Sequence, residues 1–212
     1  VYLDSAKLDE ARRAKDLDWV YGVTTNPSLM AKAGDEPEIV LKGLAELEFQ
    51  QVCYQLVSRD LDDMFVEACK AAELVKRGLI YKVAPTENGF RFVAKHRGEF
   101  PCCVTAIFDP AQALVAHEAG ARYIAVYVNR ATKHLGNGLA LVRELANVLA
   151  GSRTEILAAS LKSTKEAVNA FLAGAQHITI PFDVLTMLMN HPLSVQTLDQ
   201  FDADGIGIRW KV

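Results

Sequence analysis

Short apolar runs recur along the chain at intervals of roughly 20 to 30 residues, the length of one strand–helix unit. Each run is typical of a buried strand, and the stretches between them repeat hydrophobic positions with the period of a helix. The pattern predicts strands at 1–4, 21–26, 49–54, 79–84, 102–108, 123–128, 155–160 and 177–182. It predicts helices at 8–17, 38–48, 61–78, 110–121, 136–151 and 164–175.

Punctuation at the ends of these segments supports the assignment. Asp60 and Ser163 precede helical stretches and can cap them, and glycines follow several helix ends. Eight strands that alternate with helices in 212 residues fit one compact (β/α)8 TIM barrel spanning 1–212. A doubly wound open sheet is the competing fold, but it predicts a glycine-rich phosphate loop after the first strand, where "YLDSAKLDE" has none.

Composition excludes several classes of partner. The net charge is -3 and the pI is near 6.0, which gives no electrostatic case for nucleic acid or an anionic membrane. No apolar run approaches the roughly 20 residues of a membrane span, and no signal-peptide pattern opens the sequence. The four cysteines lack metal-site spacing and predict buried thiols of a cytoplasmic protein.

In barrels of this kind the chemistry lies where the strands run out into the loops that follow them. Each polar residue there has an ordinary structural alternative: a helix cap for Asp4, a turn for Asn26, and a core position for Tyr127. The polar residues at or near the predicted strand ends are Asp4, Thr24, Asn26, Gln51, Lys82, Thr105, Tyr127, Ser160 and Thr179.

Lys82 stands inside the apolar run "LIYKVA", and lysine is among the residues least often buried. The structural alternative is a strand-end lysine that extends to the rim of the barrel. The functional alternative is a desolvated amine, part of which is neutral and can attack a carbonyl. Polar groups converging on the same barrel mouth favour Schiff-base chemistry.

A second cluster follows the sixth and seventh strands. Arg130 lies in "YVNR", and Ser160 and Lys162 lie in "AASLK". Two cations and a hydroxyl on neighbouring loops predict a phosphate site, with solvated surface charge as the alternative.

Several motifs together resemble the short transaldolase family, and particularly its fructose-6-phosphate aldolase branch. They are "YLDSA", "GVTTNPSLMAK", "YKVAPTENG", "AQALVAHEAGARYIAVYVNR", "ILAASLKS" and "ITIPFDV", in order along the chain. The family usually has proline two residues after the lysine, whereas here it is Pro85, one place later. The loop backbone should therefore differ, because proline fixes its own φ and restricts the residue before it.

The resemblance implies roles for individual residues. Lys82 would form the imine on the fourth strand, as in class I aldolases. Asp4 and Asn26 would hold the hydroxyls of a dihydroxyacetone unit, with Thr24 beside them. The group that positions a catalytic water would be Gln51, Thr105 and Tyr127. Phosphate would be bound by Arg130 and Ser160, with Lys162 as a weaker candidate.

Two positions distinguish the branches. Transaldolases typically have glutamate on strand three and phenylalanine at the strand-six position, where this chain has Gln51 and Tyr127. A phenol can exchange a proton through a bound water, which a phenyl ring cannot do. The resemblance therefore favours an aldolase that cleaves or forms fructose 6-phosphate, without metal or organic cofactor.

Two alternatives remain open. A transaldolase would hand the same dihydroxyacetone unit to an aldose phosphate, and a non-catalytic barrel would only bind sugar phosphates. The expected partners are small sugar phosphates and hydroxyketones.

The end of the chain predicts an oligomer. Residues 200–212 follow the last helical stretch of the barrel, 183–201, and carry Ile206, Ile208 and Trp210. Leaving such side chains in water forgoes about 1.5–3 kcal/mol each. We therefore expect them to pack on a neighbouring subunit, with a tail folded on its own barrel as the alternative. The resemblance implies a homodecamer of two pentameric rings.

Overall fold

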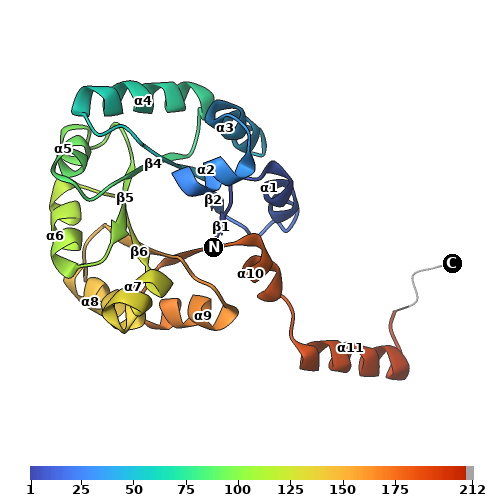
Figure 1. Ribbon diagram of the computed structural model, residues 1–212. Coiled ribbons are helices and arrows are strands. Elements are labelled where there is room, and N and C mark those ends of the chain that lie inside the picture. The colour runs from blue at the N-terminus through green and yellow to red at the C-terminus, as the bar shows by residue number, and fades with distance from the viewer. Residues whose placement is uncertain (209–212) are drawn as a thin grey trace.

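The computed structural model describes residues 1–208 as a closed barrel of eight parallel strands. The strands pair in sequence order from β1 to β8, and β8 closes the sheet by pairing with β1. Helices surround the barrel in the same order (Figure 1). The predicted (β/α)8 TIM barrel is confirmed.

Every predicted strand is present. The strands are β1 (Tyr2–Asp4), β2 (Gly22–Thr24), β3 (Gln51–Gln55), β4 (Leu79–Val83), β5 (Cys102–Ile107), β6 (Tyr123–Tyr127), β7 (Glu155–Ala159) and β8 (His177–Ile180). All bounds agree with the sequence pattern within two residues. β3 begins two residues and ends one residue later than the predicted 49–54, with a consequence for Gln51 described below.

The helices include several that the hydrophobic pattern did not predict. They are α1 (Leu8–Lys15), α2 (Pro27–Ala33), α3 (Pro37–Glu46), α4 (Leu61–Leu74), α5 (Glu87–Lys95), α6 (Pro110–Ala119), α7 (Val128–Leu135), α8 (Gly138–Val148), α9 (Thr164–Leu172), α10 (Phe182–Met187) and α11 (Pro192–Asp204). The unpredicted α2, α5 and α7 begin within four residues of the ends of β2, β4 and β6, at the carboxyl end of the barrel.

Local chemistry explains where the helices begin and end. The side chain of Asp60 accepts from the backbone N–H of Asp62, and Ser163 accepts from that of Glu166, which confirms both predicted caps. Helix α6 ends at Gly120, whose φ of 92° lies in the left-handed region that suits glycine.

The core has two parts because alternate residues of each strand face opposite sides of the barrel wall. The larger part lies between the outer wall and the helices. The inner cluster fills the barrel itself and consists of Tyr2, Cys53, Ile80, Cys103, Tyr123, Ala125 and Leu157. The middle of the barrel is therefore packed, and polar chemistry is confined to its two ends.

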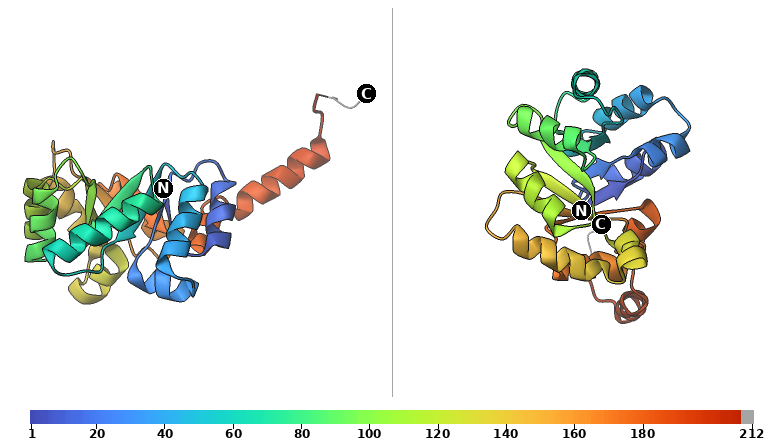
Figure 2. Two further views of the ribbon diagram at one scale, coloured as in Figure 1. Left: turned by 90° about the horizontal axis from the view of Figure 1, so that it is seen from above. Right: turned by 60° about the vertical axis from the view of Figure 1, so that its left-hand side comes forward.

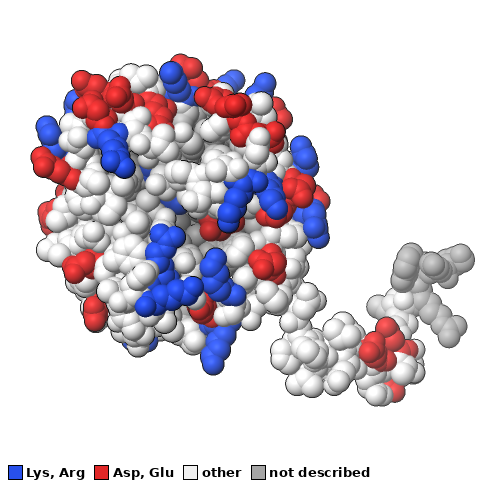
Figure 3. Space-filling view, viewed as in Figure 1, with Lys and Arg blue, Asp and Glu red and all other residues white. Residues whose placement is uncertain are grey.

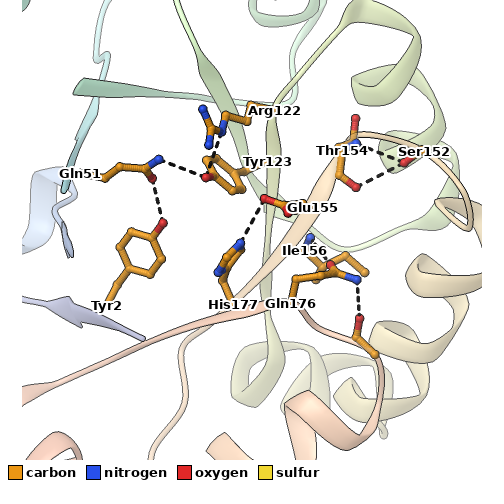
Figure 4. Close-up of polar contacts among 11 residues, drawn as sticks. Tyr2, Gln51, Arg122, Tyr123, Ser152, Thr154, Glu155, Ile156, Gln176 and His177 are labelled. Carbon is orange, nitrogen blue, oxygen red and sulfur yellow. Dashed lines mark hydrogen bonds and ion pairs between the residues drawn. The ribbon is translucent and has the colours of Figure 1, made fainter. Parts of the chain in front are cut away.

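A hydrogen-bonded group closes the amino end of the barrel (Figure 4). The Tyr2 hydroxyl donates to Gln51 Oε1 at 2.8 Å, and Gln51 Nε2 donates to the Tyr123 hydroxyl at 3.1 Å. The Tyr123 hydroxyl also accepts from Arg122 Nε at 3.0 Å. These contacts satisfy polar atoms that would otherwise be buried without partners.

The cysteines are unpaired, and three of the four are buried, as predicted, with Cys69 half-buried. Burial raises the pKa of Cys102 and of Cys103 to about 12. These thiols therefore remain protonated near neutral pH and behave as core side chains.

The C-terminal helices differ from the prediction. Helix α10 packs against α9 and β1, but α11 projects away from the barrel (Figures 1 and 2), and residues 189–208 are all exposed. The expectation that 183–201 completes the helical layer is therefore wrong beyond α10. The exposed segment begins at Met189, and α11 within it at Pro192, rather than near residue 200. Trp210 lies outside the described residues.

Helix α11 carries a partly apolar surface. Leu193, Leu198 and Phe201 are each at least 60% exposed and line one shallow groove on the helix. In the described part of the chain, no helix is long and apolar enough to cross a membrane.

Candidate active site

Lys82 is the central residue of the carboxyl end of the barrel. It lies on β4, its side chain is 3% exposed, and it shares the inward face of the strand with Ile80. Its Nζ donates to the backbone carbonyl of Thr25 at 2.9 Å. Within residues 1–208 no carboxylate forms an ion pair with it. The amine is enclosed by the wall and is fixed by one carbonyl just beyond β2, and it does not extend to the rim.

Asp4 at the end of β1 is held by a chain of hydroxyls. Thr24 Oγ1 donates to Asp4 Oδ1 at 2.8 Å and lies 2.6 Å from Thr179 Oγ1. A hydroxyl has one proton, so Thr179 must donate to Thr24 when Thr24 donates to Asp4. Both threonines are buried, so Oδ1 of the carboxylate is held on the side that faces the barrel interior. The other oxygen, Oδ2, remains available to a ligand. Asp4 does not cap α1, whose start has no side-chain cap.

Thr105 and Tyr127 form a second pair at the same end. Thr105 Oγ1 and the Tyr127 hydroxyl are 3.2 Å apart. The pairing of β5 with β6 shifts register between Val104 and Ile107, and Ala106 has a φ of 58°. Such bulges bend a strand and redirect its side chains, often beside active sites. Here the bulge follows Thr105 directly.

Asn26 has a structural role as well. Its side chain accepts from the backbone N–H of Leu29 at 3.0 Å and so caps α2. The amide oxygen is therefore engaged, and any ligand contact would fall to the Nδ2 donor. Asn26 stands beside Thr25, whose carbonyl holds Lys82.

Arg130 lies in the first turn of α7, directly after β6, and Ser160 and Lys162 lie in the neighbouring loop after β7. The guanidinium of Arg130 stands over the Tyr127 ring, 4.9 Å from its centroid. Ser160 has a φ of 57°, and its carbonyl accepts from the backbone N–H of Asn129 at 3.1 Å. In the described part of the chain neither Arg130 nor Lys162 forms an ion pair. Figure 3 shows Lys and Arg side chains gathered on this face, around where α7 lies in Figure 1.

Gln51 does not belong to this group. It is the first residue of β3, pairs in register with Gly22, and bonds to Tyr2 and Tyr123 at the amino end. The expectation that it lies with Thr105 and Tyr127 is therefore wrong. The residue in register with Lys82 is Gln55, the last of β3, which faces inward with Gln51 and Cys53 by strand alternation.

The sequence contained the signal for Gln55. Gln51, Cys53 and Gln55 occupy alternate positions of one run, and the residue nearest its carboxyl end belongs to the mouth of the barrel. The carbonyl of Thr25 gave no signal, because any residue supplies a backbone carbonyl. Among residues 1–208, no group of three or more His, Cys, Asp or Glu side chains could hold a metal ion.

The fold and the site together have the features of one class of protein. These are a closed parallel barrel, a buried lysine near the end of its fourth strand, and hydroxyl, carboxylate and amide groups around that lysine. The model of the Transaldolase/Fructose-6-phosphate aldolase family matches residues 1–207. The chain belongs to this family.

Curated relatives give the same assignment. A probable transaldolase of Thermodesulfovibrio yellowstonii is 34% identical over 206 residues, which cover 96% of each chain. A probable transaldolase of Hydrogenobaculum sp. is 36% identical over 206 residues, covering 96% of this chain and 94% of that protein.

Solved structures add information on the fold alone. A mandelate oxidase variant crystallised with a substituted phenylacetate superposes with a TM-score of 0.61 at 17% identity. The match covers 86% of this chain and 64% of that one. A second mandelate oxidase structure, with (S)-2-phenylpropionate, gives a TM-score of 0.58 at 18% identity over 82% of this chain and 59% of that one.

The two glutamines of β3 provide a matched test of which end carries the reaction. Gln51→Met should remove the partners of two phenols, destabilise the fold by about 1–3 kcal/mol, and lower Tm by about 2–4 °C per kcal/mol. Its kcat/KM for sugar phosphates should stay within about twofold of the wild type, because a packed layer separates it from Lys82. Gln55→Met should keep its Tm but lose about tenfold or more in kcat.

Thermal unfolding and steady-state kinetics on both variants decide the matter. A loss of kcat in Gln51→Met with none in Gln55→Met would reverse the assignment.

Proposed function

We propose that the protein is a Schiff-base enzyme that cleaves or forms fructose 6-phosphate from dihydroxyacetone and glyceraldehyde 3-phosphate. The observation that carries the proposal is the enclosed amine of Lys82, whose Nζ has one backbone carbonyl as its hydrogen-bond partner. A lysine in such a position is suited to nucleophilic attack on a ketone.

The reaction begins with addition of the Lys82 amine to the C2 ketone of the sugar phosphate. The carbinolamine loses water to give an iminium ion, which accepts the electron pair of the C3–C4 bond as that bond breaks. The proton of the C4 hydroxyl passes to a base, and glyceraldehyde 3-phosphate leaves. The remaining enamine takes up a proton at C3, and water hydrolyses the imine to free dihydroxyacetone and Lys82.

The surrounding residues have distinct parts in this scheme. Asp4, held by Thr24, and the Nδ2 of Asn26 bind hydroxyls of the dihydroxyacetone unit. Tyr127 and Thr105 share a water that relays the C4 proton, and Gln55 takes the position that the sequence assigned to Gln51. Positioned proton transfer of this kind contributes roughly 10² to 10⁴ in rate.

Phosphate binds at Arg130 and Ser160, with Lys162 at the edge. The absence of ion pairs to these cations within residues 1–208 supports the assignment, since their charge is free for an anion. A guanidinium bonds phosphate oxygens in bidentate geometry, and the contact is stronger than a neutral one.

Transaldolase activity is the second candidate, and the relatives described as probable transaldolases favour it. Both activities share the imine and the enamine, and they differ in whether water or an aldose phosphate takes up the dihydroxyacetone unit. The Thr105–Tyr127 pair favours the aldolase, because its two hydroxyls can bind a water molecule and exchange protons with the substrate through it.

We further propose that the protein works as a homo-oligomer, a decamer by the family resemblance, in the cytoplasm, where its unpaired thiols stay reduced. The exposed apolar positions of α11 support an interface with a neighbouring subunit.

Lys82 should be the residue that forms the imine. Borohydride reduction in the presence of fructose 6-phosphate should leave a mass adduct on the peptide that contains Lys82, because the reduced imine is a stable secondary amine. Lys162→Ala, which removes a lysine from the same face, should still give the adduct, and Lys82→Ala should give none. Binding of the sugar phosphate without an adduct under turnover would support a non-catalytic barrel instead.

The need for an acceptor separates the two activities. With fructose 6-phosphate alone the enzyme should release glyceraldehyde 3-phosphate and free dihydroxyacetone, and erythrose 4-phosphate should not be required. Tyr127→Phe should reduce this cleavage by about 10² or more and favour transfer, because the water loses its proton partner. Turnover only in the presence of erythrose 4-phosphate would establish the transaldolase.

Removal of α11 should change the assembly and leave the barrel folded. A chain ended after Asn190 lacks α11, whereas a control ended after Asp204 keeps it and loses only the last residues. In light scattering, we expect the first chain to have fewer subunits per particle than the control. Its thermal unfolding transition in circular dichroism should be unchanged for the barrel. An equal number of subunits per particle in the two chains would exclude α11 as the interface.

A further inference from the structure

Glu166 on α9 connects the two segments that carry the candidate phosphate site, the start of α7 and the loop after β7. Its Oε1 accepts from Asn129 Nδ2 at 2.9 Å, and its Oε2 accepts from the backbone N–H of Lys162 at 2.7 Å. Asn129 precedes Arg130 on α7, and Lys162 lies two residues after Ser160. One half-buried carboxylate thus links the start of α7 to the loop after β7.

These contacts differ from those of an ordinary helix cap. Ser163 and Glu166 have the spacing of a capping box, and Ser163 Oγ accepts from the Glu166 backbone N–H at 3.1 Å. In that motif the glutamate returns to the backbone of the cap residue itself. Here it reaches past Ser163 to Lys162 and across to α7, so capping does not account for both of its oxygens.

The start of α7 and the loop after β7 are also joined by a backbone contact. The carbonyl of Ser160 accepts from the Asn129 N–H, and Ser160 has a φ of 57°, a left-handed conformation that is unfavourable for a non-glycine residue. Such a backbone persists where its surroundings hold it. Asn129 therefore bonds to Ser160 through its backbone and to Glu166 through its side chain, which fixes the spacing between Arg130 and Ser160.

We infer that Glu166 is a positioning residue for the phosphate group of the substrate. It does not touch the phosphate itself, which its charge would repel. It holds Arg130, Ser160 and the Lys162 backbone in one arrangement, so that the anion meets a preformed site. The inference rests on the proposed phosphate role of Arg130 and Ser160.

The test compares two acceptors of equal chain length, erythrose 4-phosphate and erythrose. Dihydroxyacetone is the donor, or fructose 6-phosphate if free dihydroxyacetone is not used. Glu166→Gln keeps the shape of the side chain, but one of its two oxygens becomes an NH₂ group. That group cannot accept a hydrogen bond, so either Asn129 Nδ2 or the Lys162 N–H loses its acceptor. It should raise KM for erythrose 4-phosphate about tenfold, leave kcat for that substrate within about threefold, and change kcat/KM for erythrose by about twofold at most.

Asn129→Ala should show the same selectivity, because it removes the partner of Glu166 on α7. Glu67→Gln is the matched control. Glu67 also braces a loop, accepting from the Tyr54 hydroxyl and from the backbone N–H groups of Val57 and Ser58, but on the β3 side of the barrel. Any change it causes should be equal for the two aldoses.

Arg130→Ala separates failure of this inference from failure of the proposed function. If Arg130→Ala is selective for the phosphorylated aldose and Glu166→Gln is not, the inference is wrong and the phosphate site stands. If Arg130→Ala affects both aldoses equally, the proposed phosphate site is wrong and the inference falls with it. If Arg130→Ala and Glu166→Gln are both selective, the double variant should be no more selective than Arg130→Ala alone. Glu166 acts only by positioning Arg130 and its neighbours, so its loss should have little further effect once Arg130 is removed.

Discussion

Alternation of side chains in a closed parallel sheet is the constraint on which this structure depends. Every second residue of each strand must face the barrel interior, and the closed wall leaves no route out except at the ends. The middle is filled by small and apolar groups such as Ile80, Cys103 and Leu157. The packed middle therefore separates two polar regions, one at each end of the barrel. Each region contains only the inward-facing residues that lie near that end of the strands.

The carboxyl region depends on neighbours in space more than in sequence. Lys82 on β4 is held by a carbonyl that follows β2, Asp4 on β1 by a hydroxyl of β2, and Thr105 on β5 meets Tyr127 on β6. Each of these candidate site residues is thus oriented by a strand, or the residue just beyond a strand, other than its own. The sheet register fixes the positions of those strands relative to one another.

Much of the fold could be predicted because buried parallel strands read as short apolar runs, and all eight runs became strands. Helices α2, α5 and α7 were missed because each begins within four residues of the end of a strand, where a loop was expected, and a cap contact such as that of Thr86 with Gly89 helps to start α5. Gln51 was misplaced because the predicted strand 49–54 put it within the strand, whereas β3 begins at Gln51 and the side chain therefore lies at the amino end of the barrel. The kinds of residue at the site could be read from the sequence, but pairings such as Thr24 with Thr179, 155 positions apart, could not.

The exposure of α11 also bears on why that segment is a helix at all. Isolated helices shorter than about 12–15 residues are marginal in water, since nucleation fixes several residues for one hydrogen bond. Helix α11 has 13 residues, contains β-branched Val195 and Thr197, and carries three aspartates without a basic residue in its last turn. Its helix–coil equilibrium alone would leave it partly unwound. An interface that covered Leu193, Leu198 and Phe201 would therefore also stabilise the helix itself, so that folding of the segment and its burial would occur together.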